Sequence, residues 1–141
     1  MNGLADSDSE KEKTIMSKKI VQTAGRDQLG DFAPTFAHLN DDVLFGEVWN
    51  EEAIDVKTKC IITVVSLMAS GMTDSSLGYH LQNAKNNGVT KEEIAAIITH
   101  ATMYVGWPKG WAVFRQAKRY GTRMVLLSPK RTDIRTPSSS R

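Results

Sequence analysis

Apolar residues recur with a helical period along the segment SSLGYHLQNAKNNG, residues 75–88. The spacing i, i+3, i+4 and i+7 predicts an amphipathic helix, and its inward face includes one histidine. A titratable ring on such a face is either a core residue with a hydrogen-bond partner or part of a functional site. The inward stripe consists of Leu77, His80, Leu81 and Ala84.

Capping residues divide the rest of the chain into further helices. Asp55 is a suitable N-cap for a helix that closes at Gly71, and Thr90 with Glu93 forms a capping box for another. A last helix of about residues 108–127 begins at a proline. The helix after Asp55 is apolar nearly all round, so we expect it at the centre of the core. Strand signals are nearly absent, and the pattern predicts an all-α fold, a small helical bundle.

Two short helices are predicted upstream of these. Pro34 can occupy the first turn of one, where its missing N–H group costs nothing. Asp41 or Asp42 can cap the second, which carries Val48 and Trp49.

The chain of 141 residues is expected to form one folded domain over residues 18–128. The flanking segments 1–17 and 129–141 are polar, with little to bury, and we expect them to be disordered. The composition, 40% apolar and 24% charged, is ordinary for a soluble globular protein.

Charge and composition exclude several classes of function. A formal net charge of +2 gives no argument for a nucleic-acid partner. The start of the chain lacks the apolar core of a signal peptide, and the longest apolar run, residues 60–69, is too short to span a bilayer. A single cysteine excludes an intramolecular disulfide. We therefore expect a cytoplasmic protein with no membrane partner.

Histidine is the first residue type that could carry chemistry. His80 could act as a general acid or base, because histidine titrates near neutral pH. No acidic residue lies three or four positions away to orient its ring, so a buried structural imidazole is an equal alternative. His100 is at the edge of the next apolar stripe and favours a structural role, and His38 is expected to be exposed. Three histidines without an acidic cluster give no reason to expect a metal.

The segment TMYVGWPKGWAVF, residues 102–114, is the second candidate. Pro108 opens a helix whose first amides have no partner within the helix, and Gly110 would leave the backbone approachable, which suits a carboxylate. The alternative is that both tryptophans pack in the core or at a subunit interface. The aromatic residues that would wall such a site are Tyr104, Trp107, Trp111 and Phe114.

Two charged side chains complete the set of candidates. Glu47 lies on an otherwise apolar short helix, so it is either a buried carboxylate with a raised pKa or a solvent-facing residue. Arg115 begins a row with Arg119 and Arg123 that a solvated cationic face explains. Arg115 is near enough to the aromatic segment to stay a candidate for substrate binding.

The histidine helix and the aromatic segment together resemble the carboxymuconolactone decarboxylase family. The pattern H-x-x-x-A-x-x-N-G-x-T-x-E-E-I starts at His80 and is followed by Y-x-G-W-P, and the likeness extends over roughly residues 24–120. The resemblance implies an all-α, alkylhydroperoxidase-D-like fold with a central helical hairpin, assembled as a homotrimer or homohexamer. It also implies one of two chemistries, cofactor-free decarboxylation of 4-carboxymuconolactone or peroxide reduction by a Glu and a Cys-x-x-Cys-x-x-x-His set.

The chain departs from the peroxide-reducing branch of that family. Counted back from His80, the cysteine pair falls at Thr73 and Ser76, and Cys60 lies near the position of the glutamate. A hydroxyl group cannot form the disulfide of the peroxidase cycle. Alkylhydroperoxidase or peroxiredoxin activity is therefore the least favoured reading.

The resemblance and the needs of decarboxylation together suggest a role for each candidate residue. Loss of carbon dioxide requires a dry carboxylate pocket, donors for the developing oxyanion and an acid that protonates carbon. His80 fits the acid, the amides after Trp107 fit the anion pocket, and Trp107, Trp111 and Tyr104 fit the dry walls. Glu47 could orient His80 or destabilise the substrate carboxylate.

Two alternatives stay open at the level of the sequence. The protein could be a non-catalytic oligomeric binding protein of the same fold, in which His80 is a core or interface residue. The substrate could also be another lactone or a β-keto acid instead of 4-carboxymuconolactone.

Overall fold

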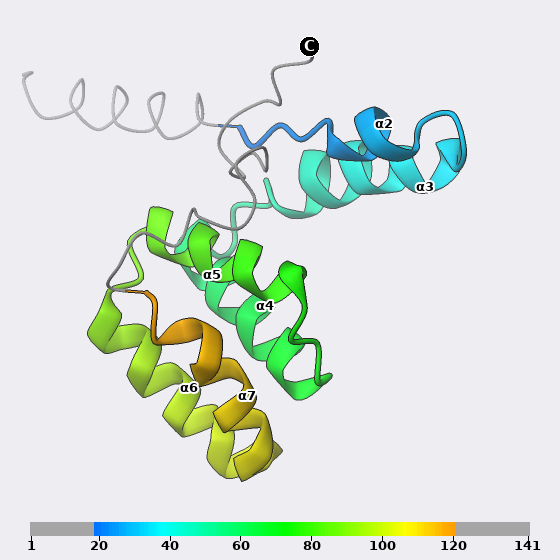
Figure 1. Ribbon diagram of the computed structural model, residues 1–141. Coiled ribbons are helices and arrows are strands. Elements are labelled where there is room, and N and C mark those ends of the chain that lie inside the picture. The colour runs from blue at the N-terminus through cyan, green and yellow to red at the C-terminus, as the bar shows by residue number, and fades with distance from the viewer. Residues whose placement is uncertain (1–18, 121–141) are drawn as a thin grey trace, which may run out of the picture. The chain divides into compact units, whose positions relative to one another are not determined.

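A computed structural model describes residues 19–120, which contain helices and no strands (Figure 1). The all-α prediction is confirmed for this part of the chain. The predicted segments 1–17 and 129–141 lie outside the described residues. The helices are α2 (Ala24–Leu29), α3 (Pro34–His38), the π-helix η1 (Leu39–Val48), α4 (Val56–Ala69), α5 (Ser75–Asn86), α6 (Lys91–Val105) and α7 (Trp107–Ala117).

The described chain divides into two compact units, residues 19–51 and residues 52–120. The first holds α2, α3 and η1, and the second holds α4 to α7. The predicted domain of residues 18–128 spans both units. No helix in either described unit combines the length and the apolar character needed to cross a lipid bilayer.

The first unit departs from its prediction at the second short helix. Pro34 does occupy the first turn of α3, as expected. The chain then continues into η1 without a break, because His38 keeps a helical conformation at φ −60° and ψ −48°. The prediction that Asp41 or Asp42 caps a separate helix is therefore wrong. The carboxylate of Asp41 instead accepts hydrogen bonds from the amides of Gly25 and Arg26 at the start of α2.

The second unit follows its local signals closely. Asp55 accepts a hydrogen bond from the amide of Thr58 at 2.8 Å and caps α4. The capping box at the start of α6 has both of its hydrogen bonds, between Thr90 and Glu93. Gly71, Gly88 and Gly106 end the three preceding helices with positive φ angles, as a residue without Cβ allows.

Helix α4 contacts α5, α6 and α7, and its inner side supplies much of the core. Its outer side is not covered, since Ile62 is 49% exposed and Ser66 faces solvent. The expectation that α4 lies at the centre of the core thus holds for its inner side, while its outer side stays open. The hydroxyl of Ser66 donates back to the carbonyl oxygen of Ile62, which satisfies it within the helix. The largest fully buried side chains of the unit include Val64, Met68, Leu77, Leu81, Ile94, Ile98 and Val113.

Helix α7 is shorter than predicted. It ends at Ala117, and residues 118–120 form a turn, so the predicted end near residue 127 is wrong for this helix. The turn is fixed by Tyr120, which is buried and donates its hydroxyl to the carbonyl oxygen of Val89 at 2.6 Å. Burial raises the pKa of this phenol well above its usual value.

A glycine sets the approach of α6 and α7. A Cβ atom added at Gly110 would lie 2.3 Å from Oγ1 and 2.8 Å from Cγ2 of Thr102, which is itself buried. We expect Gly110→Ala to lower the free energy of unfolding by about 1–3 kcal/mol, because a packed core accommodates an added methyl only by strain. Urea unfolding measures this loss.

The matched control is the double variant Gly110→Ala, Thr102→Ala, which removes the side-chain atoms that the new Cβ would meet. It should recover part of the loss attributed to Gly110→Ala alone. Equal unfolding midpoints for wild type and Gly110→Ala would contradict the close packing.

Candidate functional site

His80 lies at the border of the core on α5. Asp74 caps this helix by accepting a hydrogen bond from the amide of Ser76 at 2.9 Å. The His80 side chain is half-buried, with its Nδ1 atom shielded from solvent, and its ring meets that of Tyr79 edge to face at a centroid distance of 5.0 Å. Leu77 on the same stripe is fully buried. The imidazole is thus held by the core while part of the side chain stays accessible.

Helix α7 holds the connection between α4 and α5. The Nζ atom of Lys109 donates to the carbonyl oxygen of Ala69 at 2.7 Å, and the side-chain amide of Gln116 donates to the carbonyl oxygen of Thr73. A Cβ atom at Gly78 would lie 3.1 Å from Oε1 of Gln116, so α5 and α7 also approach closely there. Gln116 therefore marks the face of α7 that contacts α5.

His80 and the tryptophans lie on sides of their helices that face away from this contact. His80 follows Gly78 by two residues, which places it about 200° around α5. Trp107 and Trp111 lie about 180° and 140° around α7 from Gln116 by the same helical geometry. The predicted site requires His80 and the tryptophans to lie close together. The α5–α7 packing does not bring His80 close to Trp107 and Trp111 within one protomer.

The aromatic segment is on the surface of the protomer. Trp107 and Trp111 are 60% and 59% exposed, and Tyr104 is 80% exposed, so the alternative that these tryptophans are core residues is excluded. Arg115, one turn beyond Trp111, is also exposed. Trp107, Trp111 and Arg115 follow one another at four-residue spacing and form one stripe, which we call the tryptophan face.

Gly110 does not leave the backbone open to a ligand. It is buried against Thr102, and its amide donates to the carbonyl oxygen of Gly106 at 3.4 Å. The expectation of an approachable backbone at this position is therefore wrong, and close packing with α6 explains the glycine.

An open apolar groove of about 530 Å³ lies between α4 and α6. His100 and Tyr104 are its polar members, and their rings are in contact at a centroid distance of 5.3 Å. One signal of this groove is present in the sequence, namely the apolar character of α4 beyond its inward stripe. The remaining lining residues are Ile61, Val65, Ala96, Ile97, Ala101 and Val105.

Glu47 lies on η1, in the first unit, with its side chain exposed to solvent. Phe45 and Trp49 on the same element are buried and their rings stack at 5.9 Å, so the π-helix turns Glu47 outward. Of the two alternatives that the sequence left open, the structure thus favours the solvent-facing one. Whether Glu47 acts on His80 stays a prediction.

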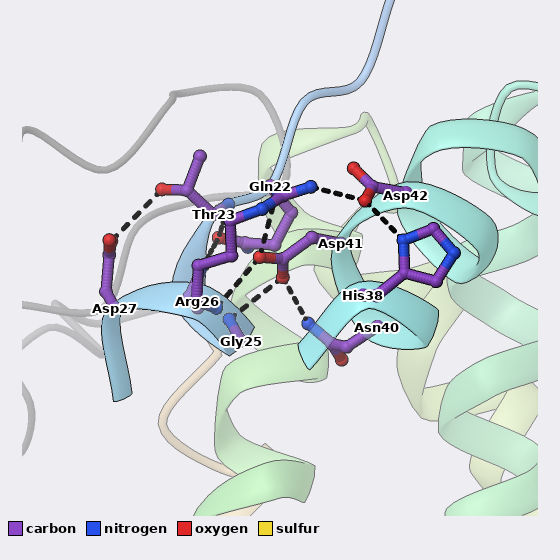
Figure 2. A network of polar contacts seen from close by, with 10 residues as sticks. Gln22, Thr23, Gly25, Arg26, Asp27, His38, Asn40, Asp41 and Asp42 are labelled. Atoms are coloured by element: carbon purple, nitrogen blue, oxygen red, sulfur yellow. Dashed lines mark hydrogen bonds and ion pairs between the residues drawn. The ribbon is translucent and has the colours of Figure 1, made fainter. Parts of the chain in front are cut away.

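A polar network ties α2 to η1 in the first unit (Figure 2). The side chain of Asp41 is fully buried, and that of Asp42 is shared between Arg26 and the Nδ1 atom of His38. The hydrogen bond from Arg26 holds the pKa of Asp42 below its usual range, with His38 as the next contributor. His38 is 60% exposed, as expected. The network therefore joins α2 to η1. Among the residues described, no group of three or more His, Cys, Asp or Glu side chains is placed to hold a metal ion.

The fold and these residues can now be compared with known proteins. The profile of the carboxymuconolactone decarboxylase family matches residues 34–119, more than half of the chain. The chain belongs to this family. The resemblance found in the histidine helix and the aromatic segment is thereby confirmed.

Two relatives within the family carry names of decarboxylases. A 4-carboxymuconolactone decarboxylase of Acinetobacter baylyi is 34% identical over 104 residues, which cover 74% of this chain and 76% of that protein. The nitrosuccinic acid decarboxylase npaB of Metarhizium robertsii is 30% identical over 96 residues, which cover 68% of this chain and 66% of that protein. An uncharacterised 15.0 kDa protein of Paracoccus denitrificans is 31% identical over 68 residues, 48% of this chain and 51% of that protein.

Cys60 does not have the exposed position that a redox-active thiol needs. Cys60 is the only cysteine in the sequence, and it is fully buried on the inner side of α4. Thr73 and Ser76 carry hydroxyl groups at the start of α5, where the resemblance places the thiols of the peroxide-reducing branch. Thr73 and Ser76 therefore supply no thiol for a redox cycle at the start of α5.

Proposed function

We propose that the protein decarboxylates a small dicarboxylic acid without a cofactor. The support is the likeness to two decarboxylases whose printed substrates differ, 4-carboxymuconolactone and nitrosuccinic acid. Both compounds carry two carboxyl groups, and in both the electron pair left by carbon dioxide can pass to oxygen atoms, of a conjugated lactone or of a nitro group. The substrate class proposed here is defined by these two shared features.

His80 is the proposed acid of this reaction. The bond between the carboxyl carbon and the adjacent carbon breaks, and its electron pair delocalises onto the substrate's oxygen atoms. The imidazolium of His80 then donates a proton to carbon, and solvent returns a proton to the ring. A half-buried imidazole with its Nδ1 atom shielded suits this task, because the core holds the ring while part of the residue stays accessible.

The remaining candidates are assigned to substrate binding. Arg115 would bind the carboxylate that stays on the substrate, since a guanidinium group pairs well with a carboxylate. Trp107, Trp111 and Tyr104 would exclude water and so strengthen these electrostatic interactions. Glu47 is proposed to orient His80 or to destabilise the departing carboxylate.

The experiment is a measurement of carbon dioxide release from 4-carboxymuconolactone and from nitrosuccinic acid by the wild-type protein. We expect turnover of at least one of these acids, at a rate above that of the same protein unfolded in urea. Release at the rate of the unfolded control with both acids would contradict the proposal. It would favour the binding-protein alternative or another acid.

A further inference from the structure

The groove between α4 and α6 leaves aliphatic side chains in contact with water. Its volume is about 530 Å³, and Ile61, Val65, Ile97 and Val105 on its walls are only half-buried. None of its lining residues is an Asp, Glu, Lys or Arg. Apolar surface that is continuous across two helices is unfavourable in water and commonly marks a binding site. The groove therefore has the character of a docking surface.

The groove begins near the N-terminal ends of the two helices. Lys57 of α4 and Glu93 of α6 form an ion pair at 2.9 Å, and the groove begins about one helical turn after each of them. Along α6 its lining extends from Ala96 to Val105, a distance of about 13 Å at the rise of an α-helix. An occupant of the groove therefore needs an apolar run of about this length.

The chain leaves the described region close to this end of the groove. Tyr120 is buried and donates its hydroxyl to the carbonyl oxygen of Val89, just before the first turn of α6. Burial, the Cys60 thiol of α4 and the Glu93 carboxylate of α6 raise the pKa of this phenol, so Tyr120 lies near the start of both helices. The distance along α6 from Val89 to the first groove residue is about 10 Å, which three extended residues can span. Residues 121–123 are therefore long enough to bring the next residues to the groove.

The sequence after Tyr120 contains one run of the required kind. Residues 121–141 lie outside the described residues, and within them Met124–Leu127 is a run of four consecutive large apolar residues. Ile134 is the only further aliphatic residue of that segment apart from proline. Four residues in an extended chain span about 13 Å, which equals the length of the groove along α6. The run thus matches the groove in length and in apolar character.

The charges that follow this run match the far end of the groove. Helix α6 ends at Val105 with no basic residue in its last turn, although the C-terminus of a helix carries a partial negative charge. Lys130 and Arg131 come three and four residues after Leu127. A segment that follows the groove from its start therefore brings these two cations to the C-terminal end of α6.

We infer that residues 124–127 dock in the groove between α4 and α6 of their own chain, with Lys130 and Arg131 beside the C-terminal end of α6. The inference does not depend on the proposed decarboxylation. Docking removes the half-buried walls of the groove and the apolar run from water together, so it stabilises the second unit.

Cross-linking tests whether the run reaches the groove. The full-length chain carries Cys60→Ala, Val65→Cys in the middle of the groove and Leu126→Cys, and is treated with a short bismaleimide. The matched control carries Ile134→Cys in place of Leu126→Cys. Docking raises the effective concentration of one thiol at the other, so we expect an adduct within one chain at least about tenfold faster than in the control.

Two results of this measurement would overturn the inference. Equal rates with Leu126→Cys and Ile134→Cys would show that the apolar run has no preferred place in the groove. An adduct that forms only between two chains, identified by mixing chains with different tags, would show that the groove receives a second copy instead.

Urea unfolding of the full-length protein tests the docking without a cross-link. Leu126→Asp should lower the unfolding midpoint, and Ile134→Asp should leave it unchanged, because both add one negative charge and only the first removes an apolar side chain from the groove. The loss from Leu126→Asp should be smaller in a Val65→Ser background, where the groove is already altered. Equal midpoints for wild type and Leu126→Asp, or an undiminished loss in the Val65→Ser background, would refute the docking.

Discussion

Replacement of His80 by alanine is expected to lower kcat for decarboxylation by about 100-fold to 10,000-fold, the usual contribution of a general acid. The reason is that a water molecule in place of the ring would not be held in position to donate a proton to carbon. The helix itself should persist, because Asp74 and the glycine at residue 88 still define its ends. Steady-state kinetics with the acid turned over by the wild-type protein measures the loss.

A matched control and a stability measurement separate catalysis from folding. His38→Gln changes an exposed histidine and keeps a donor for Asp42, so it should retain wild-type kcat. If His80 were a structural residue, His80→Ala would instead lower the free energy of unfolding by a few kcal/mol. Unchanged kcat in a folded His80→Ala protein would refute the role of the general acid.

Replacement of Asp41 by alanine is expected to have the largest effect on stability among the substitutions considered, a loss of about 3 kcal/mol. The side chain of Asp41 is fully buried and accepts hydrogen bonds from the amides of Gly25 and Arg26, both at 2.9 Å. It also accepts a hydrogen bond from Asn40 at 2.9 Å and pairs with the guanidinium of Arg26 at 3.3 Å. Alanine leaves these donors without their acceptor and removes the side-chain cap of the Gly25 and Arg26 amides at the start of α2.

Urea unfolding measures the total loss, and hydrogen exchange locates it. The amides of Gly25 and Arg26 should exchange much faster in Asp41→Ala than in wild type. Asp42→Ala is the matched control, because this neighbouring carboxylate is 41% exposed and bonds no backbone amide of α2 among the contacts described. It should change the exchange of those amides far less. Equal exchange in wild type and Asp41→Ala would show that the carboxylate does not cap α2.

The ends of several helices could be predicted because the signals are local. The side chain of Asp55 reaches an amide three residues away, and Thr90 and Glu93 bond each other within one turn. Gly88 ends α5 because its positive φ angle disfavours other residues. Each of these interactions joins residues within one helical turn, so the sequence alone indicates it.

The missed features depend on residues far apart in the sequence. Asp41 caps α2 through the amides of Gly25 and Arg26, which are 16 and 15 residues away in the sequence. The residues next to Asp41 therefore predicted a cap on the wrong helix. Gly110 of α7 packs so closely against Thr102 of α6 that a larger residue would clash. The residues next to Gly110 in the sequence do not indicate this contact. The end of α7 likewise depends on Tyr120, whose partner Val89 is 31 residues away.

The sequence by itself determined the all-α class, most helix limits and the family, because periodicity, caps and motifs are properties of short segments. It also placed His80 on an inward face. Only the tertiary structure decided that Gly110 is a packing residue and that Glu47 faces solvent. It alone showed that His80 and the tryptophan face point away from the α5–α7 contact, because the direction of a side chain relative to another helix is set by how the two helices pack.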